Sequence, residues 1–400
     1  MKNSCIKRNI QQIILLSFMC LAMKGQVLIR INNESVTNYS YVGGDEFNQT
    51  NIDKSFWHLT PWPKTNMAQF FAYSERNSEV KDGVLELLLK REDSTYSIGP
   101  LEIDSNFLRK RKIKLENQKY LMKYSAGSLI SAQKFHYGLY ELRFKIEEGK
   151  GVWPAFWFYG GNKNEEIDVF ELKGERLNQI HVDTHCPYGC DNGYKNKWGF
   201  ATDWGGWIKT TNNLNNGFNI MLLEWREDGV TWYLNGSPIA NFKGSFLNPM
   251  NIYINTQVAS DFSAFQPGPD QTLKSPNIFY VDYLRIWKKN NAQTACTLKT
   301  NHDGTSSKKF ESDYLNRMKS RKNKTVDGFI SLQRIEPNKI LISTFGKVNR
   351  QKTGLIFRGA FGNYEVKGFE SEVILNPNET KLEMELILPN HTIHQAIILN

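Results

Sequence analysis

The chain has 400 residues, of which 40% are hydrophobic and 23% are charged, and this composition excludes an intrinsically disordered protein. The formal net charge of +9 would suit an acidic glycan or a nucleic acid. No helical groove-reading motif or zinc-finger spacing accompanies the basic residues, so we expect no nucleic acid as a partner. Aromatic residues reach 13%. Their flat rings suit sugars but also fill ordinary cores, and composition alone leaves both roles open.

The N-terminal residues are typical of an export signal. Basic residues precede an apolar run at residues 13–22, and the small residue Gly25 follows. The run is shorter than the roughly 20 residues of a membrane span, so we expect no stable membrane insertion. We therefore predict that residues 1–25 are removed and that the protein is secreted, or exported to the periplasm or cell surface. Cys20 as a lipid-anchor cysteine is the alternative, although bulky residues precede it.

Most of the remaining chain alternates apolar and polar residues with a period of two, which predicts strands. The clearest runs are residues 84–89, 139–146, 230–234 and 279–287. Asn235-Gly236 stands between two apolar runs, the pattern of a two-residue β-hairpin. Many short strands separated by turn residues predict an all-β sandwich.

Composition also predicts the domain boundaries. The strand pattern of the main domain, residues 26–290, ends at Trp287. A polar and basic stretch at residues 291–325 is typical of a linker. Strand patterning returns in residues 326–400, which we expect to form a small C-terminal β module of unassigned role.

Three of the five cysteines lie beyond the predicted signal: Cys186, Cys190 and Cys296. The first two flank a short turn sequence, and we predict a loop disulfide between them in an oxidising compartment. Two free thiols, or a zinc site that also uses His181 and His185, are the alternatives.

The segment 165–172 carries the chemistry. Glu166 and Asp168 share one face of a regular strand, while Glu171 points to the other face. One extra residue, a β-bulge at Val169-Phe170, would bring Glu171 onto the acidic face. Glu166 and Glu171 would then be roughly 13 Å apart at Cα. Inward-leaning side chains can narrow this to the ~5–5.5 Å carboxylate separation of a retaining glycosidase. The competing interpretation of three acids on one strand is a calcium site.

Neighbouring residues favour a sugar site. Trp153, one strand upstream, is a candidate platform for a sugar ring. His181, Asp183 and His185 alternate downstream and so share a strand face, with His185 the expected substrate-binding residue. Further candidate platforms follow in what we expect to be a glycine-rich loop: Trp198, Trp204 and Trp207.

These segments belong to a longer series of motifs. They are Asp45-Glu46-Phe47-Asn48, Tyr137-Gly138-Leu139-Tyr140-Glu141, Gly151-Val152-Trp153-Pro154-Ala155-Phe156-Trp157, Glu166-Ile167-Asp168-Val169-Phe170-Glu171, Trp232-Tyr233-Leu234-Asn235-Gly236 and Tyr280-Val281-Asp282-Tyr283-Leu284. In this order they make residues 45–288 resemble glycoside hydrolase family 16, the laminarinase, agarase and carrageenase group.

The resemblance implies a jelly-roll sandwich of two curved antiparallel sheets. It also implies that Glu166 is the nucleophile, Asp168 an assisting acid and Glu171 the general acid/base, with no cofactor required for catalysis. A structural calcium on the convex side is implied as well, near Asp282 and with Glu46 as a further ligand.

The chain departs from the laminarinase pattern after Asn255, where residues 256–260 replace a glycine-rich run. We predict a monomeric, retaining endo-β-glycanase with β-1,3-glucan as the first polysaccharide substrate. A red-algal galactan (agar, porphyran or carrageenan) is the second, favoured by the positive charge if the glycan is sulfated. A non-catalytic carbohydrate-binding sandwich is the alternative of another class.

Overall fold

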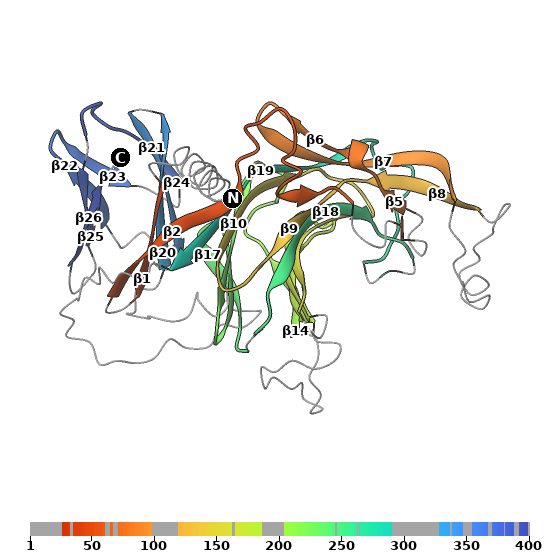
Figure 1. Ribbon diagram of the computed structural model, residues 1–400, viewed down its shortest axis with the longest axis horizontal. Helices are drawn as coiled ribbons and strands as arrows, with labels where there is room; N and C mark the ends of the chain where they lie inside the picture. The colour runs from red at the N-terminus through yellow and green to blue at the C-terminus, as the bar shows by residue number, and fades with distance from the viewer. Residues whose placement is uncertain are drawn as a thin grey trace, which may run out of the picture. The chain divides into compact units, whose positions relative to one another are not determined.

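The structure is a computed structural model (Figure 1). It describes residues 26–398 with gaps at 33–34, 61–64, 67–70, 98–118, 162–164, 186–203, 245, 262, 264, 290–327, 337, 347–353, 367–369, 380 and 388–391. The predicted export signal, all three remaining cysteines, Trp198 and the predicted linker lie outside the described residues. No helix among the described residues is long and apolar enough to cross a membrane.

The chain divides into two compact units, and the larger one extends from Gly43 to Ile286. One of its two sheets has seven strands in the order β14-β13-β12-β11-β18-β9-β3. Their bounds are β14 Trp204–Lys209, β13 Gln179–His185, β12 Glu165–Glu171, β11 Val152–Gly160, β18 Met250–Val258, β9 Ser128–Phe135 and β3 Trp57–His58. Every pairing in this sheet is antiparallel.

The second sheet of this unit contains the order β17-β16-β15-β10-β19, and β7 also pairs with β19. The bounds are β17 Ser237–Phe242, β16 Gly229–Leu234, β15 Asn219–Arg226, β10 Gly138–Ile146, β19 Asn277–Lys289, β7 Val84–Ser97, β6 Ser78–Lys81, β8 Lys119–Ala126, β5 Phe71–Tyr73 and β4 Thr65–Asn66, with a 3-10 turn at Glu75–Asn77. The β5–β8 pair is parallel. Figure 1 shows the two curved sheets, and the predicted jelly-roll sandwich of largely antiparallel sheets is confirmed.

The core of this unit lies between the two sheets because every second side chain of each strand points inward. Phe156 and Phe158 of β11 and Ile167 of β12 are fully buried on the inner side. Trp225 and Trp232 are contributed by the opposite sheet and are equally buried. The side chains that alternate with them, including those of Glu166 and Asp168, therefore point away from this core.

The predicted hairpin is also confirmed. Leu234 pairs with Ser237, which leaves Asn235 and Gly236 as a two-residue turn. Their φ values of 47° and 76° are left-handed. Asn and Gly are the residues that adopt this conformation at lowest cost.

The smaller unit is a second β-sandwich. One sheet has the order β2-β1-β20-β21-β24 and the other β23-β22-β25-β26. The bounds are β1 Gln26–Asn32, β2 Ser35–Asp45, β20 Gly328–Glu336, β21 Lys339–Gly346, β24 Glu370–Ile374, β23 Asn363–Val366, β22 Gly354–Gly359, β25 Lys381–Ile387 and β26 Thr392–Ile398.

Here the structure differs from the expected boundary at residue 26. Residues 26–42 belong to the unit of the C-terminal strands, because β1 pairs with β20 and Ile29 lies opposite Ile330. Ile29 is fully buried in that unit's core. Alternation of apolar residues predicts a strand, but it does not say which sheet the strand joins.

Candidate active site

A β-bulge in β12 shapes the site. Asp168 pairs with Asp183 of β13 and Glu171 pairs with His181, so three steps on β12 match two on β13. The one extra residue places Glu171 on the same face as Glu166 and Asp168, as the sequence predicted. At the bulge the buried Trp232 indole donates a 3.0 Å hydrogen bond to the Asp168 carbonyl.

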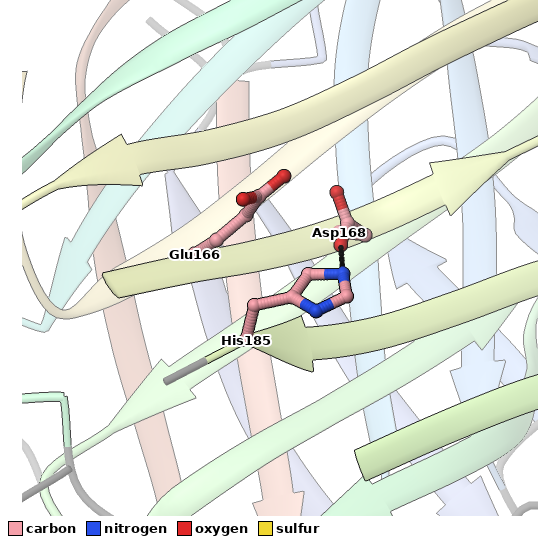
Figure 2. A group of neighbouring side chains, drawn as sticks. All are labelled: Glu166, Asp168 and His185. Carbon is pink, nitrogen blue, oxygen red and sulfur yellow. Dashed lines mark ion pairs between the residues drawn. The ribbon is translucent and has the colours of Figure 1, made fainter. Parts of the chain in front are cut away.

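The first acidic group consists of Glu166, Asp168 and His185 (Figure 2). His185 Nε2 lies 3.2 Å from Asp168 Oδ2, and one polar atom from each of the three residues lies within 4.8 Å of the others. Asp168 is buried, with 2% of its surface exposed. Because the imidazole pairs with the carboxylate, we interpret the group as an internally compensated charge cluster. A metal ion bound among these three side chains would have to displace the ion pair between His185 and Asp168.

Burial dominates the electrostatics of this group. It raises the pKa of Glu166 to about 7, with His185 opposing the shift and Glu171 adding to it. Burial also raises the pKa of Asp168 well above its ordinary value, and the charges of Glu166 and Glu171 add to this. Burial disfavours the charged form of His185, but Asp168 and Asp183 outweigh it and raise the pKa of His185 to about 11. His185 is therefore a cation near neutral pH.

Glu171 has a different set of partners. Trp153 Nε1 donates a 3.0 Å hydrogen bond to Glu171 Oε1, and His181 Nδ1 lies 3.2 Å from Oε2. The Trp153 ring stacks face to face on Phe265, with centroids 4.2 Å apart and planes 5° apart. The structure therefore gives Trp153 a contact with an acid, in addition to the sugar-platform role expected from the sequence.

The loop between β18 and β19 delivers Phe265. Lys173, two residues after Glu171, donates to the carbonyl of Gln266 and fastens this loop to the acidic strand. The Phe265 ring also lies edge-on to His181, with centroids 5.6 Å apart. Sequence reasoning did not identify Phe265, because only the fold brings the loop to β12.

The two described tryptophans of β14 lie on opposite faces. Trp207 is 36% exposed and its ring centroid lies 5.1 Å from that of His181, so it lies at the site as expected. Trp204 stacks on Trp232, with centroids 5.6 Å apart, and packs against the core. The structure therefore does not bring Trp204 to the acidic face together with Trp207. Residues 204–209 form a strand, not a loop, and a three-residue step along a strand reverses the face.

A further aromatic group, which the sequence did not single out, adjoins Glu166. Tyr159 pairs with Glu166 across β11 and β12. Trp157 stacks on Tyr253, with centroids 4.3 Å apart, and donates a 2.7 Å hydrogen bond to Asn255. The spacing of Trp153, Trp157 and Tyr159 by even steps on one strand was the available signal.

The expected calcium ligands have other partners. Arg285 forms a bidentate pair with Glu46 at 2.7 and 2.8 Å. Arg143 pairs with Asp282 at 2.6 Å. Because each carboxylate is neutralised by a guanidinium group, these contacts do not fit the role of calcium ligands. The sequence alone does not show that an arginine side chain lies against Glu46 and another against Asp282.

Comparison with known proteins adds the family. The model of glycosyl hydrolases family 16 matches residues 71–285. Glucan endo-1,3-beta-glucosidase A1 of Niallia circulans is 23% identical over 292 residues, which cover 64% of this chain and 39% of that protein. Glucan endo-1,3-beta-glucosidase of Cryptopygus antarcticus is 26% identical over 190 residues, 42% of this chain and 68% of that protein. The chain thus spans only about two fifths of the length of the first of these relatives.

Among solved structures, the catalytic domain of an endo-1,3-beta-glucanase (laminarinase) from Thermotoga petrophila RKU-1 matches with a TM-score of 0.50. The two are 21% identical, and the match covers 64% of this chain and all of that domain. This likeness supports the two-sheet fold of the larger unit.

Proposed function

Since the chain belongs to glycosyl hydrolase family 16, we propose that it is a retaining, endo-acting glycosidase that cleaves a β-linked polysaccharide. The bulge in β12 carries this proposal, because it places Glu166 and Glu171 on one strand face with different partners. A retaining glycosidase needs two such carboxylates, one to attack and one to protonate.

In the proposed reaction Glu166 attacks the anomeric carbon and forms a covalent glycosyl-enzyme. Glu171 gives its proton to the leaving oxygen and then takes a proton from the water that releases the sugar. Trp153 and His181 hold Glu171 in place for both steps. His185 supplies the positive charge that favours the ionised form of Glu166.

For the substrate we propose β-1,3-glucan first, because the two relatives named above are called glucan endo-1,3-beta-glucosidases. The partly exposed ring of Trp157 and the exposed ring of Trp207 are candidate stacking surfaces for sugar rings. A sulfated red-algal galactan is the second candidate, supported by the net charge of +9. Export from the cell remains a proposal that rests on residues 1–25.

The test is a reducing-end assay of the full chain on laminarin, lichenan, agarose, porphyran and carrageenan, with Glu166→Gln and Glu171→Gln as matched inactive controls. We expect rapid release of oligosaccharides from laminarin by the wild type alone. Activity confined to a galactan would replace the glucan with the second candidate. Binding to a polysaccharide with no cleavage would favour the non-catalytic sandwich.

A further inference from the structure

Strand β13 presents three titratable side chains to the acids of β12. His181, Asp183 and His185 alternate along the strand and so share one face. They pair in register with Glu171, Asp168 and Glu166, respectively. The middle position is an acid placed opposite another acid, an arrangement that costs stability unless cations compensate it.

One oxygen of Asp183 faces both imidazoles. His181 Nε2 lies 3.9 Å and His185 Nε2 lies 3.8 Å from Asp183 Oδ2. His181 contacts Glu171 through its other ring nitrogen, Nδ1, at 3.2 Å, whereas His185 contacts Asp168 through the same Nε2, also at 3.2 Å. Asp183 is thus the centre of a row of five contacting side chains: Glu171, His181, Asp183, His185 and Asp168. This row connects Glu171, the proposed general acid, to Asp168, which lies beside the proposed nucleophile.

The surroundings hold Asp183 in this orientation. Its Oδ1 accepts a 2.7 Å hydrogen bond from the Thr184 backbone N–H, which turns Oδ2 toward the histidines. On the other side Gly205 of β14 pairs with Asp183. A Cβ at position 205 would lie 2.8 Å from Asp183 Cγ, so the missing side chain leaves room for the carboxylate.

We propose that Asp183 is a positioning residue that keeps both imidazoles directed at the two ends of the acidic motif, and this inference rests on the proposed function. Its charge favours protonated His185 and holds His181 from the side opposite Glu171. The two catalytic carboxylates are thereby electrostatically coupled through β13. From β12 the charged groups that face Asp183 and its histidines are Glu166, Asp168 and Glu171. On β14 the partners are Gly205 beside Asp183 and the uncharged Trp207 beside His181.

The sign of the effect follows from the charges. Asp183 raises the pKa of Glu166 and that of His185. In Asp183→Asn, His185 loses one of its negative neighbours, and we expect its pKa to fall by about one unit from about 11. His185 then still carries its charge at pH 6–8. Glu166 therefore feels only the loss of a like charge, and its pKa falls too.

The experiment compares wild type, Asp183→Asn and Asp183→Ser, since serine keeps an oxygen for the Thr184 N–H. Asp228→Asn removes an exposed carboxylate elsewhere and is the matched control. We expect the acidic limb of the pH profile of kcat/KM to move by about 0.5–1 pH unit to lower pH in both Asp183 variants. We also expect a roughly tenfold loss of kcat, because one side of His181 is no longer held. NMR titration of the His185 imidazole should show the lowered pKa.

An unmoved acidic limb and an unchanged His185 titration would overturn the proposal, as would an equal shift in Asp228→Asn. Failure of both Asp183 variants to fold would also overturn it, since Asp183 would then be a folding determinant. The NMR titration requires no substrate. If wild type cleaves no glycan, the proposed function fails while the coupling through Asp183 is still measured.

Discussion

Trp153 has two proposed roles, to position Glu171 through a hydrogen bond and to stack on a sugar ring, and removal of the hydrogen bond alone distinguishes them. In Trp153→Phe the donor of the 3.0 Å bond to Glu171 Oε1 is lost, while the aromatic ring can still stack on Phe265. Hydrogen bonds to charged groups contribute about 1.5–3 kcal/mol. Trp153 is only partly buried, so water can replace part of the bond and the lower end applies.

A loss of about 1.5 kcal/mol of transition-state stabilisation corresponds to a roughly tenfold lower catalytic rate. We therefore expect Trp153→Phe to lower kcat about tenfold and to leave KM nearly unchanged, because phenylalanine retains most of the stacking surface. Steady-state kinetics on the glycan cleaved by wild type provide the measurement. Trp157→Phe is the matched control, because it removes an indole on the same strand that does not contact Glu171 in the structure. An unchanged kcat with a raised KM would refute the positioning role and make Trp153 a sugar platform.

Four further predictions follow from the site and the fold. Glu166→Ala should be nearly inactive, with azide giving the inverted α-azide on an activated substrate, whereas Glu171→Ala with azide should give the retained β-azide; product NMR distinguishes them. Because burial raises the pKa of Glu166 to about 7, protonated Glu166 contributes to the free energy of unfolding. This contribution is fully present below the ordinary glutamate pKa and is lost as the pH rises through 7. Glu166→Gln should therefore raise the melting temperature more at pH 8.5 than at pH 4, and an equal gain at both would contradict this. Ile29→Ala should destabilise the smaller unit by about 2–4 kcal/mol in denaturant unfolding and leave glycan cleavage unchanged, because Ile29 is buried in that unit's core. Cys186 and Cys190 should resist alkylation until reduced, and mass spectrometry showing both thiols free would reject the disulfide.

The sequence by itself determined the local structure of the site. The alternating acids of residues 165–171 required a strand, and one residue too many for a regular alternation required the bulge that the structure contains. The Asn235-Gly236 turn was predictable for the same reason, because local backbone geometry admits few residues there. The family motifs likewise identified the fold of the larger unit.

The contacts between segments that are distant in the sequence were decided only by the tertiary structure. Only the fold brings Phe265 onto Trp153, places an arginine at Glu46 and another at Asp282, and turns Trp204 toward the core. The assignment of β1 to the smaller unit also depends on pairing across some three hundred residues. A strand's alternation specifies two faces but neither the neighbour nor the face that is buried, because pairing and burial depend on side chains contributed by other strands.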